Sequence, residues 1–281
     1  MATAEPSRTA MITAVCRGRH RDLDADPHVL DDRFALDLVG SAWTSIDETL
    51  GAALPEPARS QMRAGMVARS RYVEDRAVDG GFTQYVLIGA GLESFAWRRP
   101  DLLDGLRVIE IDHPATQSWK RTRASTVGLT EHPNHRFVPL DLEQESLDTG
   151  LERASIDRSV PTCFAWLGVT QYLGTDAITA TLEAVARCAP GSEVVFTYVL
   201  TEPHLDDIGA LCLERNRAIA AATGEDWQTL LAPDHAAALA ERSGLAVREN
   251  LTRDDMHDRY FTGRSDDLTP YTLQGYLAAG R

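Results

Sequence analysis

Residues 85–112 constrain the fold of this chain more than any other stretch. A short apolar run at 86–88 breaks at the sequence Gly-Ala-Gly, and a second apolar run ends at Asp112. A nucleotide-binding crossover needs this order of strand, glycine turn, short helix, strand and terminal acid. Its glycines let the backbone approach a ligand without a Cβ, and the helix start offers unpaired N–H groups. Because glycines also occur in ordinary tight turns, this stretch alone leaves both interpretations open.

The length and charge of the chain limit what surrounds this stretch. A chain of 281 residues predicts one large domain, or one domain with an appended cap. Its hydrophobic content of 43% is enough for a core, but no apolar run approaches the roughly 20 residues of a membrane span. The net charge of -14 disfavours nucleic acid or an anionic membrane as the main partner, because both need basic patches.

Several other classes of protein are excluded by missing motifs. The N-terminal residues lack the long apolar segment of a secretory signal, so we expect a cytoplasmic protein with reduced, structural cysteines. Lys120 is the only lysine, and its neighbours do not form a Walker-type phosphate loop. The HExxH, CxxC and GxSxG motifs are absent, which argues against zinc proteolysis, thiol redox chemistry and the usual hydrolase elbow. We predict no metal site.

The first 80 residues are predicted to form a helical cap. Candidate helices occupy residues 9–22, 26–40 and 57–78. A proline-containing break separates the second helix from the third, and a Gly-Gly pair ends the third.

Arg69 occupies an unusual position on the third of these helices. A helical wheel places Met62, Met66, Val73 and Ala77 on one apolar face, with Arg69 in the middle of it. An arginine at such a position must extend to solvent, pair with an acid, or bind an internal anion. In the last case its bidentate geometry would suit a ligand carboxylate. The sequence leaves these interpretations open.

From residue 84 onward, strands and helices alternate. We predict strands at 84–88, 106–111, 135–140, 162–169, 192–199, 245–252 and 257–263. The first five are spaced by roughly 20 to 30 residues, which leaves room for one crossover helix each and is typical of a parallel sheet. Helices at 201–231 interrupt the alternation and could cover the carboxyl edge of the sheet, and a helix at 271–280 closes the chain.

The predicted fold class is therefore α/β. We expect a Rossmann-like, doubly wound, mostly parallel sheet of seven strands, with the helical cap at residues 1–80 and a helical insertion after the fifth strand. Residues 81–281 would form the nucleotide-binding domain and 201–231 a lid over it, with cap and domain making one structural unit.

Two features favour S-adenosylmethionine over a dinucleotide as the cofactor. The sequence GAGLES has Ser94 where a dinucleotide fingerprint uses a third glycine. The third predicted strand also ends in an acid, Asp141, followed by Leu142. Asp141 could accept a hydrogen bond from the adenine amine, so that Asp112 and Asp141 at neighbouring strand ends would hold one adenosine. Asp141 could instead be a helix N-cap.

Four blocks of sequence carry a family resemblance when they are taken in order. They are VLIGAGLESFAWR, IEIDHPATQSWKR, FVPLDL and FAWLGVTQYLGTDAITATLEAVA. Together they resemble the leucine carboxyl methyltransferase family of S-adenosylmethionine-dependent methyltransferases, whose bacterial members include tetracenomycin-type polyketide carboxyl methyltransferases. The resemblance implies a Rossmann-like fold, methyl transfer and S-adenosylmethionine as the cofactor.

The resemblance also implies roles for residues at matching positions. Arg69 would hold the methionine carboxylate, the glycine loop would lie beneath the methionine moiety, Asp112 would bind the ribose, and an Asp-Leu pair would hold adenine. The expected cofactor-binding residues are Arg69, Gly89, Ala90, Gly91, Asp112, His113, Asp141, Leu142 and Leu167.

The sequence departs from the family at Leu167. The branch that methylates proteins carries Glu at this position, before the residue that is Gly168 here. This departure argues against the C-terminal carboxylate of a protein phosphatase as the substrate, and it leaves open how the amino group of the cofactor is held. We expect the methyl acceptor to be a carboxylate of a small secondary metabolite or a peptide.

The need for a general base depends on the acceptor. A carboxylate is ionised at neutral pH and needs none, whereas a hydroxyl would need one. Tyr172 and Tyr198 are candidate substrate contacts, and His204 is the candidate base if one is used. Each also has a structural interpretation: the tyrosines as core residues with bonded hydroxyls, and His204 as a solvated helix start.

Three other functions stay open. The chain could methylate a hydroxyl of a polyketide, or it could bind the cofactor and no longer methylate. A nicotinamide-dependent reductase would need a pair such as Tyr-x-x-x-Lys, and no tyrosine lies four residues before Lys120.

Overall fold

A seven-stranded, mostly parallel sheet organises the described part of the chain, which in the computed structural model is residues 6–223 and 226–281. The spatial order is β3-β2-β1-β4-β5-β7-β6, with β7 antiparallel to both of its neighbours. The strands are β1 (Gln84–Ile88), β2 (Arg107–Asp112), β3 (His135–Pro139), β4 (Thr162–Trp166), β5 (Glu193–Val199), β6 (Ala246–Leu251) and β7 (Gln274–Gly280). The order reverses beside β1, so that the crevice between β1 and β4 opens where ligands of such folds bind.

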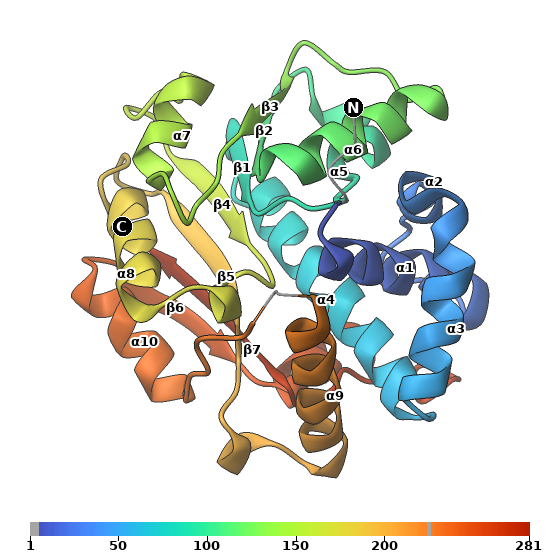
Figure 1. Ribbon diagram of the computed structural model, residues 1–281. Helices are drawn as coiled ribbons and strands as arrows, with labels where there is room; N and C mark the ends of the chain where they lie inside the picture. Colours follow the sequence, from blue (N-terminus) through green and yellow to red (C-terminus); the bar gives the residue numbers. More distant parts are fainter. Residues whose placement is uncertain (1–5, 224–225) are drawn as a thin grey trace.

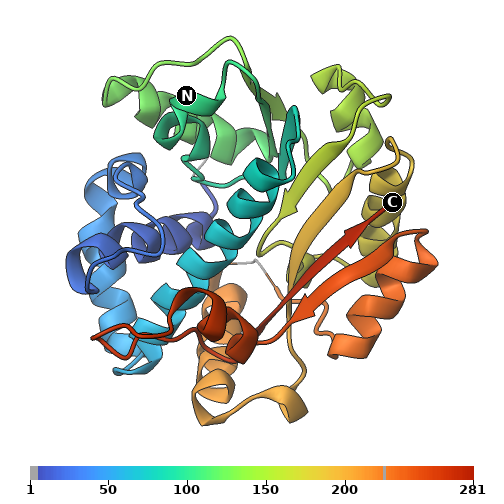
Figure 2. The same cartoon turned by 180° about the vertical axis from the view of Figure 1, so that it is seen from behind.

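Helices cover both faces of this sheet (Figure 1). They are α1 (Arg8–Leu23), α2 (Ala35–Val39), α3 (Trp43–Ala53), α4 (Ala58–Asp79), α5 (Phe95–Arg98), α6 (Pro114–Thr126), α7 (Leu147–Ala154), α8 (Thr175–Ala186), α9 (Asp207–Thr223), α10 (Pro233–Arg242) and α11 (Arg253–Tyr260). Helices α7, α8 and α10 pack on one face, and α4, α5 and α11 pack on the other. Figure 2 shows α4 crossing that second face.

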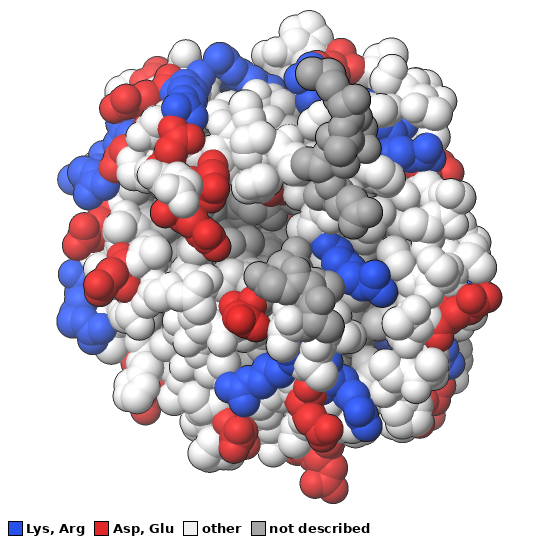
Figure 3. All heavy atoms as spheres, in the orientation of Figure 1, with Lys and Arg blue, Asp and Glu red and all other residues white. Residues whose placement is uncertain are grey.

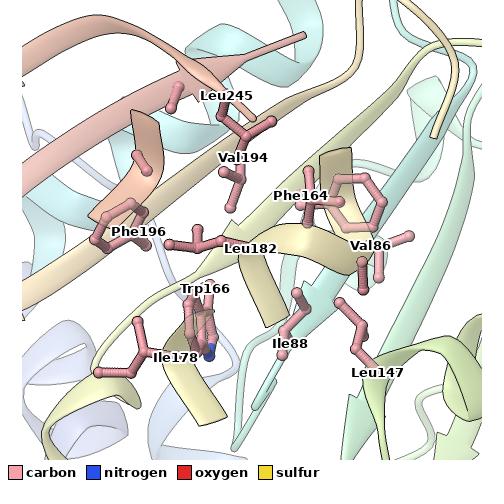
Figure 4. Packing of buried hydrophobic residues seen from close by; sticks show 14 of the residues in the cluster. Val86, Ile88, Leu147, Phe164, Trp166, Ile178, Leu182, Val194, Phe196 and Leu245 are labelled. Atoms are coloured by element: carbon pink, nitrogen blue, oxygen red, sulfur yellow. The ribbon is translucent and has the colours of Figure 1, made fainter. Parts of the chain in front are cut away.

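The first face holds the largest apolar cluster (Figure 4). Leu182 of α8 packs there among Phe164, Val194 and Phe196 from the central strands, and all four side chains are fully buried. Burying such a side chain contributes about 1.5–3 kcal/mol relative to leaving it exposed. Because strands β1, β4 and β5 are covered on both faces, their sequences are mostly apolar and do not alternate between apolar and polar residues.

The N-terminal helices are packed against the sheet domain. A third apolar cluster joins Val15 of α1 and Leu38 of α2 with Met66 of α4, Cys212 of α9 and Leu273 before β7. This shared core supports our proposal that cap, sheet and lid form one structural unit.

Two predicted elements near the C-terminus are wrong. Residues 257–263 were expected to be a strand, but residues 253–260 form α11, whose start has a capping box between Thr252 and Asp255. Residues 271–280 were expected to be a helix, yet they contain β7, in which every residue is buried. The helix-forming sequence Leu-Ala-Ala in β7 is overridden by pairing with β5 and β6 on both sides.

The second predicted helix is also different. Residues 26–40 were expected to be helical, but only α2 is helical there. A further helix, α3, follows a 3-10 turn at Gly40–Ala42 and was not predicted.

None of the helices in the described part of the chain has the length and apolar content that crossing a membrane requires. Within the same residues, no group of His, Cys, Asp and Glu side chains could hold a metal ion. All four cysteines are buried and unpaired, and burial raises the pKa of Cys16 to about 12 and that of Cys212 to about 11. These thiols are therefore structural rather than nucleophilic.

Candidate active site

A cavity of about 1260 Å³ lies at the carboxyl ends of the central strands. Its walls come from the segments that follow β1, β2, β3 and β4, together with α1 and α4. The face drawn in Figure 3 is hollowed near its centre, and Asp and Glu side chains gather beside the hollow. The cavity thus occupies the position at which open α/β sheets bind their ligands.

The glycine turn after β1 is shaped by close backbone contacts. Gly89 adopts φ +68 and donates its N–H to the carbonyl of Ile111 at 2.8 Å. A Cβ at Gly89 would lie 2.4 Å from Cγ2 of Val169, so no side chain fits without movement. Gly91 also has positive φ, and Ala90 between them lines the cavity. The turn therefore presents bare backbone to whatever occupies the cavity.

Asp112 lies at the end of β2, directly beside this turn. One carboxylate oxygen accepts a hydrogen bond from the N–H of Gly91, and the other accepts from the N–H of His113 at 2.6 Å. Burial raises the pKa of Asp112 to about 6, although both hydrogen bonds act in the opposite direction. The His113 side chain is exposed and accepts from the N–H of Ala115 as the N-cap of α6, while also lining the cavity.

Asp141 and Leu142 lie just beyond the end of β3 and are both half-buried in the cavity wall. In the β2–β3 register Asp112 is opposite Pro139, which places the two acids at neighbouring strand ends. One Asp141 oxygen accepts the N–H of Glu143 at 3.0 Å, so this acid also caps the following turn. The structure thus brings Asp112 and Asp141 to one cavity.

Arg69 enters the same cavity from α4. Its side chain is only 8% exposed, and no hydrogen bond or ion pair joins it to another of the residues the structure describes. Burial lowers the pKa of its guanidinium, with the hydroxyls of Tyr271, Tyr276 and Tyr172 acting in the opposite direction. Among the described residues, then, Arg69 is neither extended into solvent nor salt-bridged. A buried cation of this kind is costly without an anion.

The remaining predicted site residues are divided between the cavity and other places. Leu167 and Tyr172 line it, and the Tyr172 hydroxyl donates to Oγ1 of Thr9 at 3.1 Å. Tyr198 is buried outside it, with its hydroxyl donating to Oδ1 of Asn250 at 2.7 Å. His204 is exposed in a 3-10 turn at Glu202–His204 and lines no part of the cavity.

A second cavity of about 60 Å³ adjoins the first. Arg69, Gly168 and Tyr172 line both, so these residues stand at the boundary between them. Its other walls are more apolar than polar and come from α1, α4 and α9, together with Tyr198 of β5. The apolar residues include Ile12, Met62, Met66, Ile219, Trp227 and Leu273, and the polar ones include Thr13, Gln171, Thr197, Asn216 and Gln274.

Two buried charged residues of the larger cavity, Arg17 and Glu93, were not predicted from the sequence. Arg17 of α1 pairs with Asp32 at 2.8 Å and donates to the carbonyl of Leu92 at 2.7 Å. Glu93 directly follows the glycine turn and pairs with Arg98 at 2.9 Å. An acid within GAGLES was a visible signal for Glu93, whereas nothing in the first helix marked Arg17 as facing inward.

One cavity at the ligand-binding edge of the sheet thus holds a buried cation without an anion among the described residues, two acids at adjacent strand ends and a bare glycine turn. Comparison with known proteins identifies its class. The chain is 29% identical to the Bacillus subtilis protein described as "Putative S-adenosyl-L-methionine-dependent methyltransferase YktD" over 98% of both chains. Residues 10–186 match the model of the leucine carboxyl methyltransferase family. The chain belongs to this family and is an S-adenosylmethionine-dependent methyltransferase.

Solved structures support the fold. A DUF574 family protein from Streptomyces avermitilis has a TM-score of 0.61 and 16% identity, covering 99% of this chain and 98% of its own. A crystal structure titled as a putative methyltransferase from Thermobifida fusca has a TM-score of 0.61 and 18% identity, covering 100% and 96%. At these identities the likeness concerns the fold alone.

Proposed function

We propose that this enzyme transfers a methyl group from S-adenosylmethionine to a carboxylate of a small secondary metabolite or a peptide. The cofactor-binding part of this proposal rests on Arg69, a buried guanidinium without a partner among the described residues. It lines one cavity with Asp112 and Asp141. Arg69 would hold the methionine carboxylate, Asp112 the ribose hydroxyls, and Asp141 with the N–H of Leu142 the adenine. Gly89, Ala90 and Gly91 would lie against the methionine chain.

The cavity supports an acceptor that needs no base. When bound, the cofactor supplies an electrophilic methyl group, and the acceptor oxygen forms the new C–O bond as the C–S bond electrons go to sulfur. A carboxylate acceptor loses no proton in this exchange. Among the described lining residues, the single imidazole is that of His113, which lies beside Asp112 at the proposed ribose end. His204, the predicted base, lies outside both cavities.

The second cavity supports a small acceptor with an apolar part. It opens at Arg69 and Gly168, which are at the proposed methionine end, and its walls are mainly aliphatic and aromatic. We propose that the apolar part of the acceptor enters this cavity, under α9, while the carboxylate points toward Gly168. The chain itself would then contribute positioning and exclusion of water, which can be worth about 7–11 kcal/mol in well-oriented reactions.

One observation favours a hydroxyl acceptor as the second candidate. Asp226 lines the larger cavity and is exposed, so its carboxylate could take a proton from a phenol or alcohol. A cofactor-binding member that no longer methylates is the third candidate, and it predicts binding without turnover.

The product distinguishes these candidates. Purified enzyme would be incubated with S-adenosylmethionine carrying a labelled methyl group and matched pairs of small aryl acids and the corresponding phenols. We expect label in the acids, released as methanol by mild alkali because methyl esters hydrolyse and methyl ethers do not. Alkali-stable label in the phenols would overturn the carboxylate assignment. Binding of S-adenosylhomocysteine with no labelled product across both classes would favour the third candidate.

A further inference from the structure

Glu93 is a buried carboxylate in the wall of the larger cavity. It lines the wall together with Arg17, Arg69 and Ser70, and is 9% exposed. Its Oε1 accepts from the N–H of Ser94 at 2.8 Å and from Arg98 at 2.9 Å. Its Oε2 has one contact among the described residues, with Oγ of Ser70 at a long 3.4 Å. A carboxylate oxygen can accept two hydrogen bonds, so Oε2 has capacity for another donor.

Glu93 belongs to a buried cluster with more acidic than basic side chains. Its members are Arg17, Asp32, Glu74, Glu93 and Arg98. Arg17 forms an ion pair with Asp32. Arg98 forms ion pairs with both Glu74 and Glu93, so the cluster has three carboxylates and two guanidiniums. One further cation would balance the cluster, and buried charges are stable only when they are balanced.

Arg69 has the opposite imbalance and lines the same cavity. It is a buried cation without a described anion, and it is adjacent on α4 to Ser70, which contacts Glu93. Arg69 and Glu93 both line one cavity, so a single ligand there could contact both side chains. An α-amino acid carries an ammonium and a carboxylate on a single carbon, which is the ligand chemistry that would satisfy both.

We propose that Glu93 binds the α-ammonium group of S-adenosylmethionine while Arg69 binds its carboxylate. The inference rests on the cofactor site proposed above and assigns the group that Leu167, an uncharged side chain in the same wall, cannot hold. Oε2 of Glu93 accepts from the ammonium, and Oε1 stays with Ser94 and Arg98. The chain therefore selects adenosyl ligands that carry a complete amino acid.

Calorimetry with cofactor analogues tests this assignment through binding alone. The probes are S-adenosylhomocysteine and its analogue without the α-amino group, titrated into the wild type and Glu93→Gln. We expect removal of the amino group to weaken wild-type binding by about 30- to 100-fold, as for loss of a charge-assisted hydrogen bond. In Glu93→Gln, removal of the amino group from the ligand is expected to weaken binding only about threefold, because the amide carries no charge.

Two controls separate ammonium binding from support of the fold. Glu74→Gln removes another acid of the same cluster that does not line the cavity, and it is expected to keep the wild-type discrimination. Loss of the carboxylate from the ligand should weaken binding by the same factor in the wild type and in Glu93→Gln, because Arg69 is unchanged. If circular dichroism shows that Glu93→Gln does not fold, Glu93→Asp replaces it, because aspartate keeps the charge but withdraws the carboxylate by one methylene. We expect the preference of Glu93→Asp for the ligand with the amino group to be at least threefold smaller than that of the wild type.

The outcomes distinguish the two proposals. Wild-type discrimination retained in Glu93→Gln, or in Glu93→Asp where that variant is needed, would overturn the role of Glu93 and leave the cofactor site standing. A wild type that binds S-adenosylhomocysteine but does not distinguish the analogue without the amino group would do the same. A wild type that binds neither ligand would overturn the cofactor site itself.

Discussion

Gly168 and Arg69 are packed so closely that a Cβ built on Gly168 would lie 2.6 Å from Nη1 of Arg69. Gly168 also adopts φ +69, a left-handed conformation that costs a residue with a side chain about 1–2 kcal/mol. Its N–H donates to Oγ1 of Thr197 at 2.8 Å, which ties this turn to β5. The segment after β4 therefore fixes the position of the guanidinium.

Because of this contact, Gly168→Ala tests the role of Arg69 without substituting the arginine itself. The new methyl group would displace the guanidinium, and we expect S-adenosylhomocysteine to bind at least about tenfold more weakly by calorimetry. Gly174→Ala is the matched control, because its Cβ would make an ordinary 3.8 Å contact with Gln228, and binding should stay within about twofold. Gly168→Ala binding as tightly as the wild type would contradict a role for Arg69 in the site.

Asp112 should make cofactor binding depend on pH. Its pKa is raised to about 6, so the carboxylate that would accept from the ribose is ionised above this pH and is neutralised as the pH falls through it. At pH 5 about one-tenth of the unliganded enzyme would be ionised there, and we expect S-adenosylhomocysteine affinity about tenfold below that at pH 7.5.

Asp112→Asn controls for other titrating groups. We expect this variant to bind weakly at pH 7.5 and to show a flat profile down to pH 5. A wild-type affinity that does not decline toward pH 5 would contradict this role of Asp112. An equal decline in the variant would assign the pH dependence to another group.

Asp141 is expected to determine recognition of adenine. An analogue with hypoxanthine in place of adenine lacks the exocyclic amine, and the wild type should bind it about 10- to 100-fold more weakly. In Asp141→Ala the two ligands should bind alike. Because Asp141 also accepts the N–H of Glu143, unfolding of the variant must be measured in parallel. A variant that still prefers adenine would place base recognition on other residues.

Lys120 is expected to stabilise the fold rather than take part in chemistry. It is 1% exposed and pairs with the buried Glu110, which also contacts Nε2 of His135 at 2.8 Å. Lys120→Met leaves the Glu110 charge without its main partner, and removing one member of a buried pair costs about 3–5 kcal/mol. We expect urea unfolding to show a loss of this order, with a much smaller loss in the exposed control Arg121→Met.

The sequence predicted the crossover well because its features are local. A glycine turn, an apolar run and an acid at a strand end are recognisable within a few residues, and β1, β2 and the turn between them occur where expected. Arg69 was recognisable because helical spacing alone places it on a buried face. Its lack of a described partner, by contrast, depends on residues distant in sequence.

Features that depend on long-range pairing could not be predicted from local sequence. Strand β7 carries helix-forming residues, and its identity follows only from its position between β5 and β6. Tyr198 lines the second cavity, but the bond of its hydroxyl to Asn250, a contact across 52 positions, could not be predicted. The cluster around Glu93 likewise combines residues from α1, α4 and the glycine turn, and no short motif encodes it.

A crystal structure of the enzyme with S-adenosylhomocysteine would test the proposed site most directly. We predict the adenosine between Asp112 and Asp141, the ligand carboxylate on Arg69, and the ligand amino group within hydrogen-bond distance of Glu93. A ligand bound elsewhere, or an adenosine that contacts neither aspartate while Arg69 stays unpaired, would contradict it.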